Sequence, residues 1–293
     1  MISRVTNHTI MRAAQQNLQD GKGELAKLQD RATTLKKIGK PSDDPIGTAD
    51  SMRIRAEQQQ HSQYARNISD GIGWLTKVDA TLSSATDLLL KIRDLTIQGA
   101  NDGSMSTEAK EAIAVELEGL RDELITTANA QYLGRTIFAG TTDAGVAFNP
   151  DLSYAGTGTS VERRIDAENT VRVDVDGRAV FGEDGTSVFA LVDTIVADLR
   201  SGTNVGSHLI ALDAHRNALL GEHGAVGARH AQILRAEEMN MERTGSLEAQ
   251  RSGIEDVDLG EAILQLKLQE VTYQSSLAVT ARVLQPTLMD FLR

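Results

Sequence analysis

The segment from Leu259 to Arg293 constrains the fold more than any other part of the sequence, because it is one long apolar-striped stretch. It contains one glycine, Gly260, near its start and one proline, Pro286, near its end. Its apolar residues are separated by four, three, four and three positions at Leu277, Ala281, Leu284, Leu288 and Phe291. This spacing places them along one face of a helix, as in a coiled coil. Such a face requires a partner that covers it.

The first forty residues carry a matching apolar face. Steps of three and four separate Leu18, Gly21, Leu25, Leu28, Ala32 and Leu35. Residues 1–40 hold eight Lys or Arg and three Asp or Glu, whereas residues 254–293 hold three and six, so the two ends differ in the sign of their net charge. Pairing the ends would bury both apolar faces and bring the opposite charges together.

A pair of helices alone is expected to be only marginally stable. Each buried apolar side chain contributes about 1–3 kcal/mol, whereas ordering one residue costs roughly 1–2 kcal/mol. We therefore expect other copies of the chain to complete the burial. The residues expected to mediate this assembly are Leu18, Leu25, Leu28, Leu35, Leu277, Leu284, Leu288 and Phe291.

Further helices and turns follow the first face. The sequence GKPSDDPIG ends the first helix, and Ser42, Asp43 or Asp44 is expected to cap the next one, with Pro45 in its first turn. Thr107 is the expected N-cap of a helix that returns antiparallel after a glycine-containing turn. The second helix has its own apolar face at Leu75, Val78, Leu82, Ala85, Leu89 and Ile92.

The helical period disappears at about Thr141, where Gly, Thr, Asn and Asp become frequent, and it returns after Gly202. Within this interval, VRVDVDGRAVFG predicts a hairpin that turns at Asp176-Gly177. The sequence SVFALVDTIVADLRSG predicts a short helix ended by Gly202. Beyond it, a helical face resumes at Leu209, Leu212, Leu219, Val226 and Ile233.

The predicted fold is mainly α, an elongated rod of long antiparallel helices built from both chain ends with a small β-containing inserted domain. The expected parts are terminal assembly helices at 1–44 and 254–293, a helical rod domain at 45–140 and 203–253, and the insert at 141–202. Aromatic residues make up only 3% of the chain, which is typical of helices packed through aliphatic side chains.

Composition excludes several functions. The net charge of −11 disfavours nucleic-acid binding, and the absence of cysteine removes disulfides, thiolate zinc sites and thiol chemistry. No stretch reaches the ~20 apolar residues of a membrane span. The N-terminal residues also lack the apolar core of a secretory signal. The chain is therefore either cytoplasmic or exported by a route that reads another signal.

Motifs that could carry chemistry have simpler interpretations. The adjacent acids of PSDDP favour a cap and turn, DVDG lacks the spacing of a calcium loop, and AGTGTS lacks the strand and helix of a phosphate site. The histidine series is spaced by seven or eight residues, too far apart on a helix to share one ion, at His208, His215, His223 and His230. We predict no catalytic, metal or cofactor site and no enzymatic activity.

Three stretches resemble a known family. The segment KPSDDPIGTADSMRIR (40–55), the segment YLGRTIFAGT (132–141) and the stretch 254–292 are similar to hook-filament junction proteins of the flagellin-like family, in the same order along the chain. The resemblance implies a flagellin-like fold and a structural role in the bacterial flagellum, outside the cell. It implies export through the flagellar type III apparatus without a cleaved signal.

The resemblance also implies partners. These are other copies of the chain in a ring, hook-associated protein 1, flagellin and a flagellar export chaperone. The alternative within the family is a flagellin filament subunit. Two other classes are an enzyme whose insert carries a surface activity and a cytoplasmic coiled-coil signalling protein. Of these, the junction protein is favoured by the C-terminal run VLQPTLMDFL.

Overall fold

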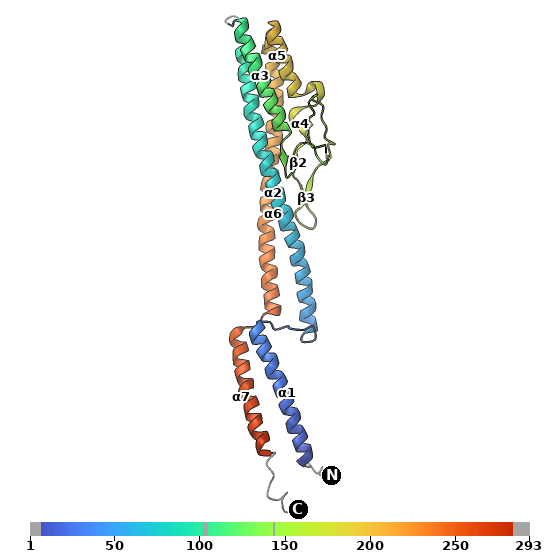
Figure 1. The fold of residues 1–293 in the computed structure, drawn as a ribbon, viewed down its shortest axis with the longest axis vertical. Helices are drawn as coiled ribbons and strands as arrows, with labels where there is room; N and C mark the ends of the chain where they lie inside the picture. The colour runs from blue at the N-terminus through green and yellow to red at the C-terminus, as the bar shows by residue number, and fades with distance from the viewer. Residues whose placement is uncertain (1–6, 102–104, 143, 284–293) are drawn as a thin grey trace, which may run out of the picture. The chain divides into compact units, whose positions relative to one another are not determined.

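The computed structural model describes residues 7–101, 105–142 and 144–283, and Figure 1 shows their arrangement. The chain divides into two compact units, one formed by Met1–Gln59 with Thr244–Arg293 and the other by Gln60–Arg243. The helices are α1 (Asn7–Thr34), α2 (Pro45–Gly99), α3 (Thr107–Ala128), α4 (Gly177–Phe181), α5 (Val188–Ser201), α6 (Leu209–Glu255) and α7 (Leu259–Val283). The strands are β1 (Gln131–Tyr132), β2 (Arg135–Thr136), β3 (Glu162–Arg164) and β4 (Thr170–Arg172).

The fold class is as the sequence predicts, mainly helical with few, small antiparallel strands. Two short 3-10 helices complete the described elements, η1 (Asp184–Thr186) and η2 (Val205–His208). In the part of the chain that the structure describes, no helix combines the length and apolar composition needed to span a bilayer.

Within the second unit, α2 and α6 run antiparallel. The ring of His223 lies 2.8 Å from the carboxylate of Asp79, and Arg93 donates to Asp213 at 2.9 Å. The later residue of α2 thus contacts the earlier residue of α6, as antiparallel helices require. The predicted apolar face of α2 is confirmed, because all of its members are buried: Leu75, Val78, Leu82, Ala85, Leu89 and Ile92. On the predicted apolar face of α6, the buried residues are spaced by seven positions: Leu212, Leu219, Val226 and Ile233.

Helices α3 and α5 pack together in the same unit. The cap of α3 differs from the expectation by one residue. Ser106, not Thr107, is the N-cap, and its hydroxyl accepts from the N–H of Ala109 at 3.2 Å. The predicted helix ended by Gly202 is confirmed as α5, because Gly202 has the left-handed φ of 80° that favours glycine at this position.

Between α3 and α5 the chain forms a small core built from aromatic rings. Edge-to-face and stacked contacts at 5.1–5.8 Å join Phe138, Phe148, Phe181 and Phe189. Asn129, at the end of α3, holds one side of this core: its amide oxygen accepts from the N–H groups of Ala147 and Phe148, at 2.7 and 2.9 Å. Aromatics make up only 3% of the sequence, so the packing of four phenylalanine rings in this one region concentrates them here.

The predicted hairpin at Asp176-Gly177 is wrong. Asp176 is the N-cap of α4, and its carboxylate accepts from the N–H of Arg178 at 3.0 Å. The observed strand pair is β3 with β4, in which Arg163 lies opposite Val171. An Asp-Gly pair suits a tight turn and a helix start equally well, since both use the short carboxylate to bind a nearby N–H.

Two glycines of this region make a matched test of the packing. Gly140 and Gly145 both have positive φ, 66° and 75°, but a Cβ on Gly140 would overlap the carbonyl oxygen of Thr159, whereas one on Gly145 meets nothing within 4 Å. We expect Gly140→Ala to lower the free energy of unfolding by more than about 2 kcal/mol and Gly145→Ala by about 1 kcal/mol. Urea unfolding checks this, and equal losses would contradict the assigned overlap.

Candidate functional site

The first unit pairs the two terminal helices, α1 and α7, side by side (Figure 1). They are antiparallel: Gln269 of α7 donates its side-chain N–H to the carbonyl of Gly21 at 3.3 Å, and the ends of the pair are joined at Lys36 and Asp256. A Cβ on Gly21 would lie 3.5 Å from the ring of Tyr273, an ordinary van der Waals contact, so Gly21 of α1 faces Tyr273 of α7. The observed pairing brings together segments about 250 residues apart in the sequence.

The face of α1 toward α7 includes three of the residues expected to mediate assembly. Leu28 is 8% exposed, and Leu18 and Leu25 are half-buried. Leu35 lies beyond the end of α1, is exposed, and has a left-handed φ of 56°. It therefore does not continue this face.

The corresponding positions of α7 are not the ones expected. Leu277 is 44% exposed, so it lies off the face toward α1. The least exposed positions of α7, apart from Glu270, share the spacing of three and four and are smaller or more polar: Ala262, Leu266, Gln269, Tyr273, Ser276 and Thr280. Leu284, Leu288 and Phe291 lie outside the described residues, and their role stays a prediction.

The side of α7 away from α1 is apolar as well. Leu264, Leu268 and Val271 are each 61% exposed, and Val279 is 60% exposed. We call these four residues the outer face of α7. Leu264, Leu268 and Val271 are spaced by four and three residues, and Val279 lies on the same side of the helix two turns further on; the sequence prediction had assigned the apolar face of this helix to other residues. A helix that is apolar on both sides is normally surrounded by partners, and α1 covers only one side.

A backbone bridge fixes the joint where α1 and α7 meet α2 and α6. The N–H of Lys37 donates to the carbonyl of Glu255 at 2.6 Å, and the N–H of Val257 donates to the carbonyl of Leu35 at 3.1 Å. These bonds tie the segment after α1 to the segment between α6 and α7. Leu35, whose carbonyl accepts the second of these bonds, has a left-handed φ of 56°.

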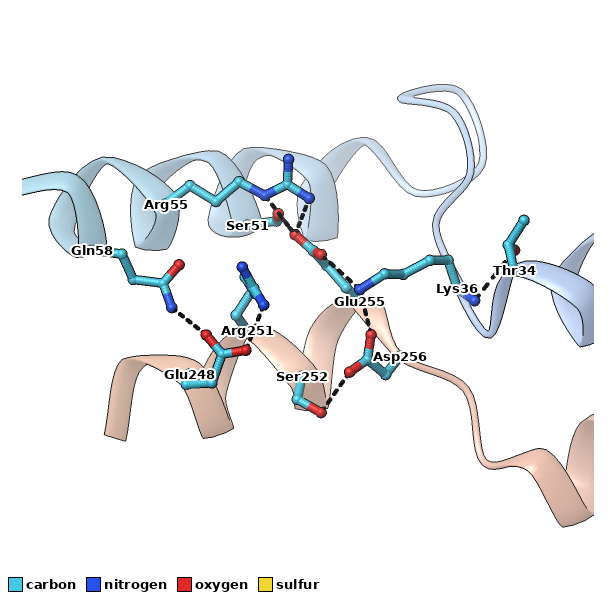
Figure 2. A network of polar contacts seen from close by, with 10 residues as sticks. All are labelled: Thr34, Lys36, Ser51, Arg55, Gln58, Glu248, Arg251, Ser252, Glu255 and Asp256. Carbon is cyan, nitrogen blue, oxygen red and sulfur yellow. Dashed lines mark hydrogen bonds and ion pairs between the residues drawn. The ribbon is translucent and has the colours of Figure 1, made fainter. Parts of the chain in front are cut away.

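The side chain of Glu255 is the centre of the joint (Figure 2). It is 5% exposed and accepts from Arg55 at 2.8 Å, from Lys36 at 3.3 Å and from the hydroxyl of Ser51. These hydrogen bonds, that of Arg55 above all, lower the pKa of Glu255 from 4.5 to about 2 although burial opposes the ionised form. A buried carboxylate is tolerated because each of its oxygens is hydrogen-bonded to a donor.

Further polar contacts surround this centre (Figure 2). Asp256 accepts from Lys36 at 2.6 Å and from the hydroxyl of Ser252 at 2.7 Å, and the bond from Lys36 is the main cause that lowers the pKa of Asp256. About two turns back along α6 from Glu255, Glu248 accepts from Gln58 at 2.8 Å. Sequence reasoning missed this network because its partners lie about 200 residues apart and no local pattern marks them.

The segment PSDDP has the cap-and-turn role that the sequence predicts. Asp43 accepts from the N–H of Lys40 at 2.9 Å, and Asp44 accepts from the N–H of Gly47 at 2.9 Å at the start of α2. Pro45 is the first residue of α2. Both carboxylates are therefore used locally by the backbone. Among the described residues, no three acidic or histidine side chains are grouped to hold a metal ion.

Comparison with known protein families first shows which class of protein this chain resembles. Residues 5–143 match the family described as bacterial flagellin N-terminal helical region. This match covers α1, α2 and α3 and ends within the region that follows β2. The resemblance to the flagellin-like family inferred from the sequence is thereby confirmed.

The similarity then extends to particular proteins over most of the chain. Flagellar hook-associated protein 3 of Salmonella typhimurium is 24% identical over 300 residues, which cover 93% of this chain and 94% of that protein. The flagellar filament 33 kDa core protein of Treponema phagedenis is 25% identical over 97% of both chains. The structure of flagellar hook associated protein-3 from Legionella pneumophila matches with a TM-score of 0.62 at 15% identity, covering 69% of this chain and 98% of that one.

The pKa of Glu255 makes the joint sensitive to acid. Because the folded-state value is depressed, its stabilisation is fully present above pH 4.5 and is lost as the pH falls toward 2. We expect Glu255→Gln to remove about 2 kcal/mol at pH 7 and to weaken the acid dependence of the first unit. The measurement is amide exchange of Lys37 and Val257, which bond across the joint.

The matched control for this variant is Glu248→Gln, which removes a carboxylate that is 54% exposed. It should change exchange of the same two amides little, because an exposed ion pair contributes about 0–1 kcal/mol. If the two variants accelerate exchange equally, burial of Glu255 is not what stabilises the joint.

Proposed function

We propose that this chain is a structural subunit of the bacterial flagellum that joins the hook-associated protein 1 ring to the flagellin filament, and that copies assemble through their terminal helices. Similarity to hook-associated protein 3 over nearly the whole of both chains supports this role. The observation that carries the assembly mechanism is the outer face of α7, where four large aliphatic side chains are uncovered on a helix whose other side already has a partner.

Burial of the outer face would drive association between copies. Each fully buried Leu or Val gains about 1.5–3 kcal/mol relative to the exposed state. Leu264, Leu268, Val271 and Val279 are more than half exposed, so most of this gain is available to a second molecule. Every copy carries the same outer face on its α7, so the α7 helices of two copies have apolar residues at the same spacing and could pack against each other.

The proposed roles divide the chain into three parts. Residues 1–44 and 254–293 form the terminal assembly helices, 45–140 and 203–253 form the helical stem, and 141–202 form an insert that faces solvent. The glutamate joint at Glu255 would hold the assembly helices in register with each other before and after assembly. Leu284, Leu288 and Phe291 would extend the assembly surface.

Export and partners follow from the same proposal. The chain would leave the cell through the flagellar type III apparatus without a cleaved signal, escorted by an export chaperone, and would contact flagellin on its distal side. No enzymatic activity is proposed, since both curated relatives compared above carry the names of flagellar structural proteins.

A flagellin filament subunit is the second candidate. It is favoured by the similarity to the 33 kDa filament core protein, which spans 97% of both chains. The two functions place the chain differently: a junction subunit forms a short ring, whereas a filament subunit forms the filament itself.

Removal of the gene separates the two candidates. For a junction protein, we expect hooks to persist and flagellin to be found in the culture medium, because filament subunits have nothing to attach to. For the main filament subunit, hooks persist and no flagellin is released. Electron microscopy of the cells and immunoblots of the medium make the measurement, and restoring the full-length gene is the control.

Substitutions on α7 test the assembly surface. We expect the double variant Leu264→Gln and Leu268→Gln to abolish incorporation into flagella while the isolated chain loses no more than about 0.5 kcal/mol, since both side chains are already 61% exposed. In contrast, Leu28→Ala removes a side chain that is 8% exposed and should lower the stability of the isolated chain by about 2 kcal/mol or more.

The control for the double variant is Gln274→Ser, an exposed polar position of the same helix. Incorporation is read by immunoblot of isolated flagella, and stability by urea unfolding of the purified chain. Normal incorporation of the double variant would show that the outer face of α7 is not the assembly surface.

A further inference from the structure

One polar pair interrupts the aliphatic contact between α2 and α6 in the second unit. Both helices carry a repeat of seven residues. On α2 the repeat consists of His61, Ile68, Leu75, Leu82 and Leu89. On α6 it consists of Leu212, Leu219, Val226, Ile233 and Asn240. The aliphatic members are all buried, so His61 and Asn240 occupy heptad positions at which the rest of both helices carries an aliphatic side chain.

Two hydrogen bonds join this polar pair. Nδ1 of His61 lies 2.7 Å from Oδ1 of Asn240, and Nδ2 of Asn240 donates to the main-chain carbonyl of His61 at 3.2 Å. Asn240 is 8% exposed, and the half-buried ring of His61 packs edge-on against the buried Tyr64, with ring centroids 5.6 Å apart. The contact thus fixes Asn240 at the level of one residue of α2, through both the side chain and the backbone of that residue.

The aliphatic members of the repeat define the register of the two helices only weakly. If α6 moved by seven residues, Leu75 would face another aliphatic residue of α6, so apolar burial would be largely kept. Gly71 favours the observed level, since a Cβ there would overlap the side chain of Ile233. That contact is apolar, however, and its loss leaves no polar group unpaired.

A shift by seven residues would separate the polar pair. Asn240 would face Ile68 in one direction, and His61 would face Ile233 in the other. Each polar group would then be buried against an aliphatic side chain. A buried hydrogen-bonding group without a partner is more unfavourable than a formed hydrogen bond is favourable. The pair therefore penalises shifted registers more strongly than the aliphatic residues do.

Other polar contacts between these helices are less selective. Arg93 pairs with Asp213, and His223 contacts Asp79, but these side chains are 29–50% exposed. Partly exposed groups remain hydrated when their partner is lost, so such contacts contribute little.

We infer that His61 and Asn240 are positioning residues that determine the register in which α2 pairs with α6. The pair adds less stability than two aliphatic side chains would, but it excludes registers shifted by seven residues. This role belongs to the single chain and goes beyond the proposed function, since it holds whether or not copies assemble.

Cross-linking of introduced cysteines reports the register, since the chain has no cysteine of its own. Asp79→Cys with His223→Cys reports the observed register, because these side chains meet at 2.8 Å. Asp79→Cys with His230→Cys, or with Arg216→Cys, reports a shift by seven residues in either direction. Each full-length chain is refolded from urea and treated with a short bifunctional thiol reagent, and cross-linked peptides are identified by mass spectrometry.

Replacement of both members of the pair by leucine should release the register. We expect His61→Leu with Asn240→Leu to increase the shifted cross-links at least about tenfold over the parent chain, since no polar group is left unpaired by the shift. The control is Arg93→Leu with Asp213→Leu, which removes a polar contact between the same helices and should keep only the observed cross-link.

The reversed pair, His61→Asn with Asn240→His, should also keep the observed cross-link. Absence of shifted cross-links from the double leucine variant, or equal amounts of them in the control, overturns the inference.

Urea unfolding gives an independent measurement. Either single variant, His61→Leu or Asn240→Leu, leaves its partner buried without this hydrogen bond, so we expect the unfolding equilibrium constant to rise about tenfold. The double leucine variant should be at least as stable as the parent chain, because two aliphatic side chains replace the pair. A double variant that is less stable than both single variants, or that does not fold, means that the two residues act separately and overturns the inference.

Discussion

Burial of aliphatic faces spaced by three and four residues is the interaction on which every helix of this protein depends. In the second unit, the face of α2 at Leu75, Leu82 and Leu89 is covered within the chain, and these residues are 0–3% exposed. In the first unit, Leu264 and Leu268 of α7 have the same side chain and the same spacing but are 61% exposed. The difference lies in the number of neighbouring helices, not in the sequence pattern, so the pattern alone does not reveal which faces remain uncovered.

Polar contacts, not apolar burial, hold the chain together between the end of α6 and the start of α7. Glu255 ends α6, and the chain turns through Asp256 before α7 begins. A buried carboxylate adds little net stability compared with an apolar residue, but it is strongly unfavourable when a partner is missing. The alignment in which Arg55, Lys36 and Ser51 all reach Glu255 is therefore favoured over neighbouring alignments that leave the charge unpaired. Apolar burial holds the helices together, and this cluster selects their register.

Features with a local cause could be predicted from the sequence. The cap at Asp44, the start of α2 at Pro45 and the end of α5 at Gly202 each follow from residues within a few positions. The apolar face of α2 follows from its period. The hairpin predicted at Asp176 was wrong because an Asp-Gly pair can begin a helix as well as form a turn. The predicted N-cap of α3 was one residue too late because Ser106 and Thr107 are equivalent candidates.

The parts of the candidate site that could not be predicted have a different cause. The glutamate joint depends on residues 255 and 55 coming together, which only the fold determines. On α7, nearly every side of the helix carries apolar residues, so several heptad faces can be drawn. The sequence selected the one through Leu277, whereas contact with Gly21 selects the one through Tyr273. A uniformly apolar helix carries the least information about its own orientation.

Leucines with a left-handed backbone conformation show how local strain can be interpreted, because in some of them a contact that offsets the strain can be identified. In the described ranges, Leu35, Leu133 and Leu152 all have positive φ. The carbonyl of Leu35 accepts from Val257 across the joint, and Leu152 is half-buried against the aromatic core with its N–H bonded to Asn149 at 2.9 Å. Their conformations are thus explained inside the chain. Leu133 has neither: its side chain is 79% exposed, and its left-handed turn position suits Asn, Asp or Gly better than leucine, so nothing within the described chain offsets this local strain.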